Sequence, residues 1–289
     1  LSSTAIDENS AGAIVGDLTT TDEDANDTHT YTLTGDDADS FEVVDGQLKL
    51  KDGVSANYEV KNSYSVTVTA TDSGGLSISS DYTVTINDVN DAPSAIKLTG
   101  SLYVNENAAG DVVGDITTVD EDAGDSHTYS ISGADASSFE IVNGQLKLKD
   151  SVSPVFVTKS SYSITVTSTD SAGAAISVDY NVEVNATPTD ISLSSYSVNE
   201  SSYGLSIGTI SATDPNTDDE LTYSITGGAD QDYFEIDSSG VLKLKDNKYA
   251  DFEADDTLTV NITVTDQGGL SFEKTFNISV NDLAYATPY

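Results

Sequence analysis

The stretch that decides the fold is FEVVDGQLKLK at residues 41–51, which recurs as FEIVNGQLKLK at 139–149 and as FEIDSSGVLKLK at 234–245. Each copy places two short apolar-rich runs on either side of a turn that contains glycine. Asp-Gly and Asn-Gly favour tight hairpin turns because both central positions tolerate positive φ. The stretch therefore predicts a β-hairpin, and its recurrence predicts a repeated β domain.

The whole chain follows one pattern three times. DENSAG, NENAAG and NESSYG open the copies, TDED, VDED and TDPN follow, and YSVTVTATDSGG, YSITVTSTDSAG and LTVNITVTDQGG come near the end. Self-similarity at a fixed period is typical of tandem domains. We therefore predict repeat 1 at 1–91, repeat 2 at 92–186 and repeat 3 at 187–284, with a tail at 285–289.

The local pattern is that of strands. Val66, Val68 and Ala70 alternate with threonines, a period of two with many β-branched residues. No long segment shows the i, i+3, i+4 apolar spacing of a helix, so several short strands per repeat predict an all-β chain of β-sandwiches. We interpret the recurring aromatic residues as core residues: Tyr31, Tyr129, Tyr223, Phe41, Phe139 and Phe234.

Composition excludes several classes of protein. The 289 residues carry 49 acids against 11 basic residues, all of them lysine, and a net charge of −38. Nucleic acids and anionic membrane surfaces need cationic contacts, so neither is expected as a partner. The absence of cysteine excludes disulfides and thiolate metal sites. No apolar run reaches the roughly 18 residues of a transmembrane helix, so we expect no direct membrane insertion.

Acidic residues recur at fixed places in the pattern and concentrate in the first connector, INDVNDAP at 86–93. Each repeat has a glutamate near its start, an acidic loop and an aspartate after its long strand. Like charges in a short connector repel one another, but hard oxygen ligands from several loops are what Ca²⁺ requires. The pattern therefore predicts calcium ions between neighbouring repeats.

At this connector the sequence resembles the cadherin fold, in particular the cadherin-like tandem repeats of large type I-secreted (RTX) bacterial surface adhesins. The D-x-N-D-x-A/P motif of that family is matched by Asp88–Pro93. The resemblance implies Ig-like Greek-key sandwiches in an extended array, with a calcium cluster at junction 1–2. Asn57 stands where the family motif normally has aspartate. The ligands that the resemblance implies are Glu8, Asn57, Glu59, Asp88, Asn90, Asp91, Asp120, Asp122 and Asp170.

Junction 2–3 departs from the motif. Val155 and Val157 replace the D-x-E pair, and the linker VNATPTD lacks the acidic core, although Glu106, Asp214, Asn216 and Asp266 persist. We predict weak or absent calcium binding there, with either a hinge or direct packing. Half-sites at the two ends imply that further repeats precede and follow: Asp22, Asp24 and Asp72 at one end, and Glu200, Asp251, Glu253 and Asp282 at the other.

No catalytic constellation is found. His29 and His127 occupy equivalent positions in different repeats, and we interpret both as strand-surface residues rather than metal ligands. An active site would break the repeat symmetry with unique insertions, and none is present, so we do not expect an enzyme.

We expect extracellular, calcium-stiffened stalk repeats of a large secreted adhesin that serves cell adhesion and biofilm attachment. The alternative is a carbohydrate-binding or homophilic adhesion module, with polysaccharide or another cell surface as partner. Tyr203, Tyr233 and Tyr249, which occur only in repeat 3, are the candidate glycan contacts.

Overall fold

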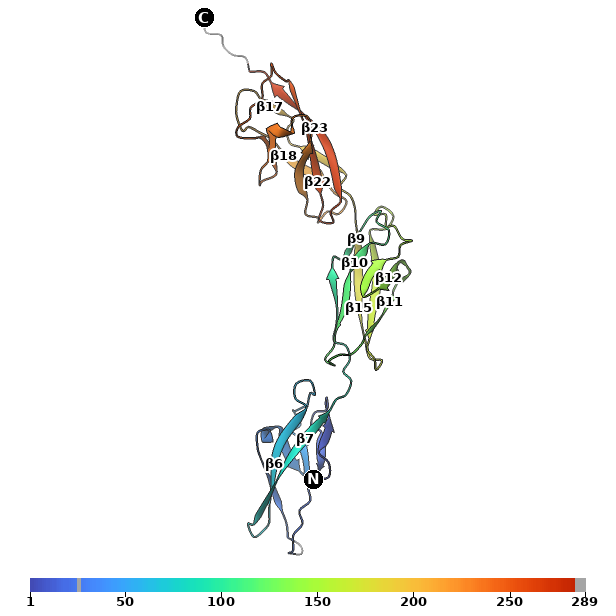
Figure 1. Ribbon diagram of the computed structural model, residues 1–289, viewed down its shortest axis with the longest axis vertical. Coiled ribbons are helices and arrows are strands. Elements are labelled where there is room, and N and C mark those ends of the chain that lie inside the picture. Colours follow the sequence, from blue (N-terminus) through green and yellow to red (C-terminus); the bar gives the residue numbers. More distant parts are fainter. Residues whose placement is uncertain (25–26, 284–289) are drawn as a thin grey trace. The chain divides into compact units, whose positions relative to one another are not determined.

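The computed structural model describes residues 1–24 and 27–283, and these residues form three β-sandwiches in tandem (Figure 1). The predicted tail at 285–289 lies outside the described residues. By contacts, the chain forms two compact units. The first comprises residues 1–96 with the loop segments 118–128 and 168–176 of repeat 2, and the second comprises the remainder of the chain.

Repeat 1 packs a four-stranded sheet, in the order β1-β7-β6-β3, against a three-stranded sheet, β2-β5-β4. The short first strand lies parallel to β7, and the other pairs are antiparallel. The strands are β1 (Ala5–Asp7), β2 (Ile14–Asp17), β3 (Thr30–Thr34), β4 (Phe41–Val44), β5 (Gln47–Leu50), β6 (Ser63–Thr71) and β7 (Ser77–Asn87), with the single helical turn η1 (Ala38–Ser40).

Repeat 2 repeats this plan with sheets β11-β14-β15-β9 and β12-β13-β10-β8. Its strands are β8 (Ala95–Gly100), β9 (Tyr103–Asn105), β10 (Val112–Val119), β11 (Thr128–Ser132), β12 (Phe139–Val142), β13 (Gln145–Leu148), β14 (Ser161–Thr169) and β15 (Ala175–Asn185), with η2 (Ala136–Ser138). The parallel pair is β9 with β15, so the chain start of this repeat is again tied to its last strand.

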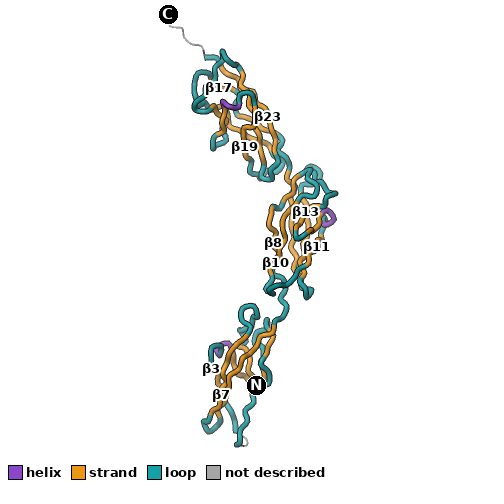
Figure 2. The backbone as a smooth tube through the Cα atoms, viewed as in Figure 1, coloured by secondary structure: helices purple, strands orange, loops and turns teal. Residues whose placement is uncertain are grey.

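Repeat 3 has sheets β17-β23-β22-β19 and β16-β18-β21-β20. Its strands are β16 (Asp190–Leu193), β17 (Ser197–Asn199), β18 (Ser206–Thr213), β19 (Thr222–Gly227), β20 (Phe234–Ile236), β21 (Val241–Leu244), β22 (Thr257–Thr265) and β23 (Ser271–Asn281), with η3 (Gln231–Tyr233). Within residues 1–24 and 27–283, helix is confined to these single turns, while loops join the strands at the sandwich ends (Figure 2).

The hairpins predicted from the recurring stretch are confirmed. Val44 pairs with Gln47, so Asp45 and Gly46 form a two-residue turn. Their φ values are 49° and 78°, and Asn143 and Gly144 have the same conformation at 51° and 80°. Both central residues thus lie in the left-handed region that Asp-Gly and Asn-Gly pairs adopt easily.

The three recurring phenylalanines lie in the cores, where Phe41, Phe139 and Phe234 are at most 2% exposed. Phe139 meets Tyr162 edge-to-face at 5.5 Å, and Phe41 meets its tyrosine in the same way. The recurring Tyr31, Tyr129 and Tyr223 occupy the less exposed positions of their alternating strands but are only partly buried, and Tyr223 packs against the core of repeat 3, so they border the cores rather than fill them. A phenol at the edge of a core keeps its hydroxyl group near polar partners, and Tyr31 Oη lies 3.1 Å from Thr20 Oγ1.

Among the described residues, no helix is long and apolar enough to cross a membrane.

Candidate metal centres

Glu8 anchors the first connector. It follows β1, is 2% exposed, and each of its carboxylate oxygens accepts one backbone hydrogen bond. Oε2 accepts from the Tyr58 N–H at 2.6 Å and Oε1 from the Val89 N–H at 2.9 Å. A buried carboxylate is stable only when it is paired in this way or bound to a cation. Glu8 therefore ties two loops of repeat 1 to the start of the connector.

The acids predicted for junction 1–2 come together. Carboxylate oxygens of Glu8, Glu59 and Asp91 lie within 4.8 Å of one another, and so do those of Glu59, Asp88 and Asp122. Glu59 belongs to both groups, so one connected cluster draws on repeat 1, the connector and the acidic loop of repeat 2. The lysines that form ion pairs do so outside this cluster: Lys49, Lys61, Lys147, Lys159, Lys243 and Lys274.

The acids of the cluster raise one another's pKa. A backbone hydrogen bond lowers the pKa of Glu59, but desolvation and the charges of Glu8, Asp88 and Asp122 outweigh it, so the net shift is upward. At Asp122 the hydrogen bond from the Asp91 backbone lowers the pKa, but desolvation and the charges of the nearby aspartates outweigh it, so the net shift is again upward. Uncompensated negative charge is thus concentrated where a cation would relieve it.

A stability test follows from these shifts. Because the pKa of both acids is higher in the folded than in the unfolded chain, the metal-free fold binds protons more tightly and gains stability as pH falls toward those pKa values. The window lies above the ordinary values of 4.5 for Glu59 and 3.8 for Asp122. We expect the chelator-stripped protein to melt at a higher temperature at about pH 5 than at about pH 7. Calorimetry with calcium present should show the opposite order, since protons compete with the ion.

Two buried carboxylate oxygens indicate whether the residues of junction 1–2 fit calcium. Asp91 Oδ2 and Asp125 Oδ2 have no hydrogen-bond partner although they are shielded from solvent. A buried unpaired carboxylate oxygen is costly, and a hard cation with six to eight oxygen ligands is its natural partner. Asp125 lines an open pocket of about 280 Å³ together with Asp88, Asn90 and Asp122. The residues of junction 1–2 therefore fit Ca²⁺.

The amides of junction 1–2 join the repeats directly. Asn90 Nδ2 donates to Asp170 Oδ2 at 2.9 Å, and the hydrogen bond from Asn90 is the main reason that the pKa of Asp170 is lowered. Asn57 Nδ2 donates to Glu121 Oε2 at 2.9 Å, while its Oδ1 accepts from the Val60 N–H. The predicted ligand Asn57 is therefore engaged as a hydrogen-bonding bridge.

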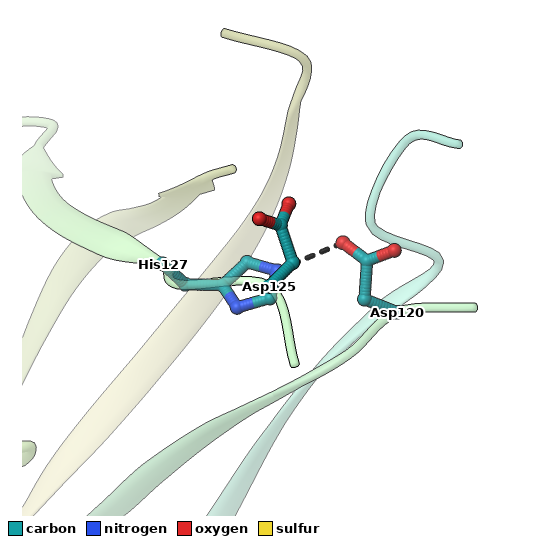
Figure 3. Close-up of side chains that lie close together, drawn as sticks. All are labelled: Asp120, Asp125 and His127. Atoms are coloured by element: carbon teal, nitrogen blue, oxygen red, sulfur yellow. Dashed lines mark hydrogen bonds and ion pairs between the residues drawn. The ribbon is translucent and has the colours of Figure 1, made fainter. Parts of the chain in front are cut away.

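Sequence reasoning missed Asp125, and it placed the two histidines on the strand surface. Asp120, Asp125 and His127 form a third group, in which His127 Nε2 lies 2.8 Å from Asp120 Oδ2 (Figure 3). Asp125 accepts from Ser171 at 2.5 Å, which lowers its pKa. Asp27 and Asp219 occupy the same place in the other repeats, so recurrence at fixed spacing was the available signal. The side chain of His127 is only 12% exposed, so it is not a plain strand-surface residue.

Most of the acids predicted as half-sites at the two ends of the chain also lie close together. Asp22 and Asp72 form a group with Asp27 at the start of the chain, and Asp22 also pairs with His29 at 3.1 Å. Glu200, Asp251 and Glu253 form a group in repeat 3. Glu200 is 1% exposed and holds the Leu283 N–H at 2.8 Å, as Glu8 holds Val89. The predicted Asp24 and Asp282 are not members of these two groups, and their role as ligands stays a prediction.

Junction 2–3 is built differently. Val155 and Val157 are 41% and 91% exposed at the positions of the missing acidic pair. Glu106 Oε1 accepts from the Thr187 N–H at 2.8 Å, and Asp214 has a pKa raised mainly by desolvation. Asp214 Oδ2 and Asp219 Oδ2 are buried without partners. The acids that remain belong largely to repeat 3, and the residues do not fit a full cluster.

The comparisons with known proteins agree with this geometry. Residues 2–87 match the family model of the cadherin domain. Cadherin domains are extracellular adhesion modules that bind calcium in general, and none of the relatives named below is an enzyme by name. Together with the three sandwiches, this makes the chain a tandem of cadherin-like domains.

Three similar proteins illustrate the match. The chain is 28% identical over 269 residues to the cadherin EGF LAG seven-pass G-type receptor fmi-1 of Caenorhabditis elegans, covering 84% of the chain and 10% of that protein. It is 31% identical over 247 residues to the Fat-like cadherin-related tumor suppressor homolog of Drosophila melanogaster, covering 78% of the chain and 5% of that protein. The chain thus spans a tenth or less of these relatives. Extracellular cadherin domains 3–6 of protocadherin gamma B2 share the fold, with a TM-score of 0.50, 23% identity, and coverage of 97% of this chain and 71% of that one.

Proposed function

We propose that this chain is a set of calcium-stiffened spacer repeats from the extracellular part of an adhesion protein. The carboxylate cluster at junction 1–2 carries the proposal, because it gathers acids from two repeats and their connector beside buried oxygens that lack a partner. The cadherin domain match over residues 2–87 supports the same role.

The residues of the carboxylate cluster would have two roles, holding the ion and positioning the connector. Calcium, when bound, supplies the positive charge that neutralises the carboxylates. Glu59, Asp88, Asp91 and Asp122 would hold it, while the buried Glu8 keeps the connector in place through the Val89 N–H. In a medium with millimolar calcium, binding to the folded state alone would stabilise that state by mass action.

Counting ions tests the proposal. Calorimetric titration of chelator-stripped protein should give about three ions per chain, since each ion takes six to eight oxygens and the carboxylates can be shared. Twice that number would mean that junction 2–3 also recruits a cluster. No saturable binding at millimolar calcium would contradict the proposal.

A finer assignment is to the stalk of a large type I-secreted (RTX) bacterial adhesin that acts in biofilm attachment. The net charge of −38 and the absence of cysteine support it, because such a chain is exported unfolded and folds outside the cell. The relatives reported above are animal cadherins, which are equally compatible with homophilic adhesion. Sedimentation in calcium separates the two, since a spacer stays monomeric and a homophilic module forms dimers.

An aromatic pair in repeat 3 supports a second candidate, glycan binding. The rings of Tyr203 and Tyr249 lie 5.0 Å apart and are 62% and 42% exposed. Tyr233, the third candidate from the sequence, packs against the core of repeat 3, and Lys248 Nζ lies over its ring. We therefore remove it from the candidate glycan contacts. If the pair binds sugar, Tyr203→Ala with Tyr249→Ala should abolish retention on a glycan array. Equal signals from the parent protein and the double variant would dismiss the candidate.

A further inference from the structure

The linker between repeats 2 and 3 is buried, whereas the linker between repeats 1 and 2 is not. Asn185 and Ala186 are 3% and 2% exposed, while the equivalent Asn87 and Asp88 are exposed. A buried connector must satisfy its polar groups within the protein. The contacts of junction 2–3 show that side-chain amides do this.

Asn185 supplies the central contact. Its Nδ2 donates to Asn105 Oδ1 at 3.0 Å within repeat 2 and to Asp266 Oδ2 at 3.0 Å in repeat 3. Asn87 and Asn281 hold the same position in their repeats and make the first type of bond, at 2.9 and 3.0 Å. Junction 1–2 has the same type of bond to the following repeat, from Asn90 to Asp170, but at junction 2–3 the single buried amide of Asn185 makes both bonds and gives the 5% exposed Asp266 a donor without an ion.

Two further amides stand where junction 1–2 has acids. Asn216 occupies the position of Asp122, accepts from the Ala186 N–H at 2.7 Å and donates to the Val184 carbonyl at 3.0 Å. Asn105 occupies the position of Asp7 and donates to the Gly268 carbonyl at 3.1 Å. A carboxylate can only accept hydrogen bonds, but an amide donates and accepts, so amides can pair across a joint without a cation.

Gly268 permits the close approach. A Cβ atom at this position would lie 2.2 Å from Asn185 Nδ2 and 2.8 Å from Asn105 Oδ1, well inside contact distance. The equivalent residue at junction 1–2 is Ala172, so the acidic junction accommodates a side chain that the amide junction excludes. Glycine is required here for space rather than for an unusual backbone angle.

We propose that the joint between repeats 2 and 3 is calcium-independent, closed by the amides of Asn105, Asn185 and Asn216 in place of bridging ions. The proposal rests on the proposed function only in using junction 1–2 as the calcium-dependent reference. The remaining acids, Asp214 and Asp219, belong to repeat 3, and each keeps one buried oxygen without a partner, so they can still hold an ion. The proposal is that closure of the joint does not depend on that ion. Withdrawal of calcium would then loosen the first joint and leave the second closed.

Hydrogen exchange of the whole chain, followed by mass spectrometry, reads both joints at once. The reporters are the Val89 and Asp91 amides at junction 1–2 and the Ala186 and Thr187 amides at junction 2–3, which all donate to side chains. On replacing millimolar calcium by chelator, we expect the first pair to exchange roughly tenfold faster or more, and the second pair to change less than about twofold. Calcium-dependent protection of Ala186 and Thr187 would overturn the proposal. Insensitivity of Val89 and Asp91 would instead count against the proposed function and leave the joint proposal standing.

Variants test the amides themselves. In chelator, Asn185→Asp and Gly268→Ala should each speed exchange of Ala186 and Thr187 roughly tenfold, while peptides from β22 stay protected and report an intact fold. Asn281→Asp is the control for the first variant, and Gly74→Ala, whose nearest atom would be 3.3 Å away, is the control for the second. Unchanged exchange in both test variants would overturn the proposal. If either variant unfolds, hydrogen exchange of the parent chain with and without calcium still tests the proposal.

Discussion

Replacing Glu59 by glutamine and Asp91 by asparagine in one chain is expected to abolish the calcium response of junction 1–2. The two residues belong to the same carboxylate group, and Glu59 also joins the second group with Asp88 and Asp122. Because calcium affinity depends on the number of charged ligands, the loss should be roughly 100-fold or more. Calorimetric titration of the double variant should therefore show no saturable binding at junction 1–2 at millimolar calcium.

The same variant should be more stable than the parent protein when calcium is absent. Removing two like charges relieves the repulsion that raises the pKa of Glu59, and the amides keep the shape of the side chains. The control is Asp36→Asn with Asp39→Asn, two exposed acids of repeat 1, which removes the same charge elsewhere. If the control lost calcium binding to the same degree, general electrostatics rather than the cluster would be responsible.

Phe139→Ala is expected to give the largest loss of stability. Phe139 is 2% exposed and packs edge-to-face on Tyr162, so truncation opens a cavity in repeat 2. Such substitutions lower the free energy of unfolding by about 3–5 kcal/mol, a large share of the roughly 5–15 kcal/mol of an ordinary domain. Calcium binding should weaken with it, because Asp120, Asp122 and Asp170 come from this repeat.

Val157→Ala is the matched control for the core substitution. Val157 is 91% exposed in the same repeat, and a surface change of this kind should alter the free energy of unfolding by less than about 0.5 kcal/mol. Denaturant unfolding of both variants is the measurement. A small effect of Phe139→Ala would mean that repeat 2 is not a cooperative unit around this ring.

Periodicity sufficed for the fold but not for every core residue. The alternation in β6 and the Asp45–Gly46 turn predict strands and hairpins because both depend on neighbouring residues in the chain. Phe139 was correctly placed in the core, whereas Tyr129 lies on the predicted face of its strand but is only partly buried. The burial of a tyrosine depends on where its hydroxyl group ends, which is decided by the neighbouring loops rather than by strand parity.

The candidate site was predictable where a motif concentrates acids in the sequence. The acids of junction 1–2 were found because a motif concentrates them, and the structure gathers them. Asp125 was missed although Asp27 and Asp219 recur at its place, because an aspartate in a polar loop has an ordinary explanation as a turn residue. Only the fold shows that its Oδ2 is buried without a partner.

By itself, the sequence determined three tandem β-sandwiches, an acidic first junction and a second junction poor in acids. These follow from composition and from patterns along the chain. Whether the second junction is a hinge or a packed joint was decided only by the tertiary structure, which buries Asn185 between Asn105 and Asp266. The reason is physical: an amide is an ordinary polar residue in a sequence, and it replaces a cation only where folding brings acceptors from two domains within reach of its hydrogens.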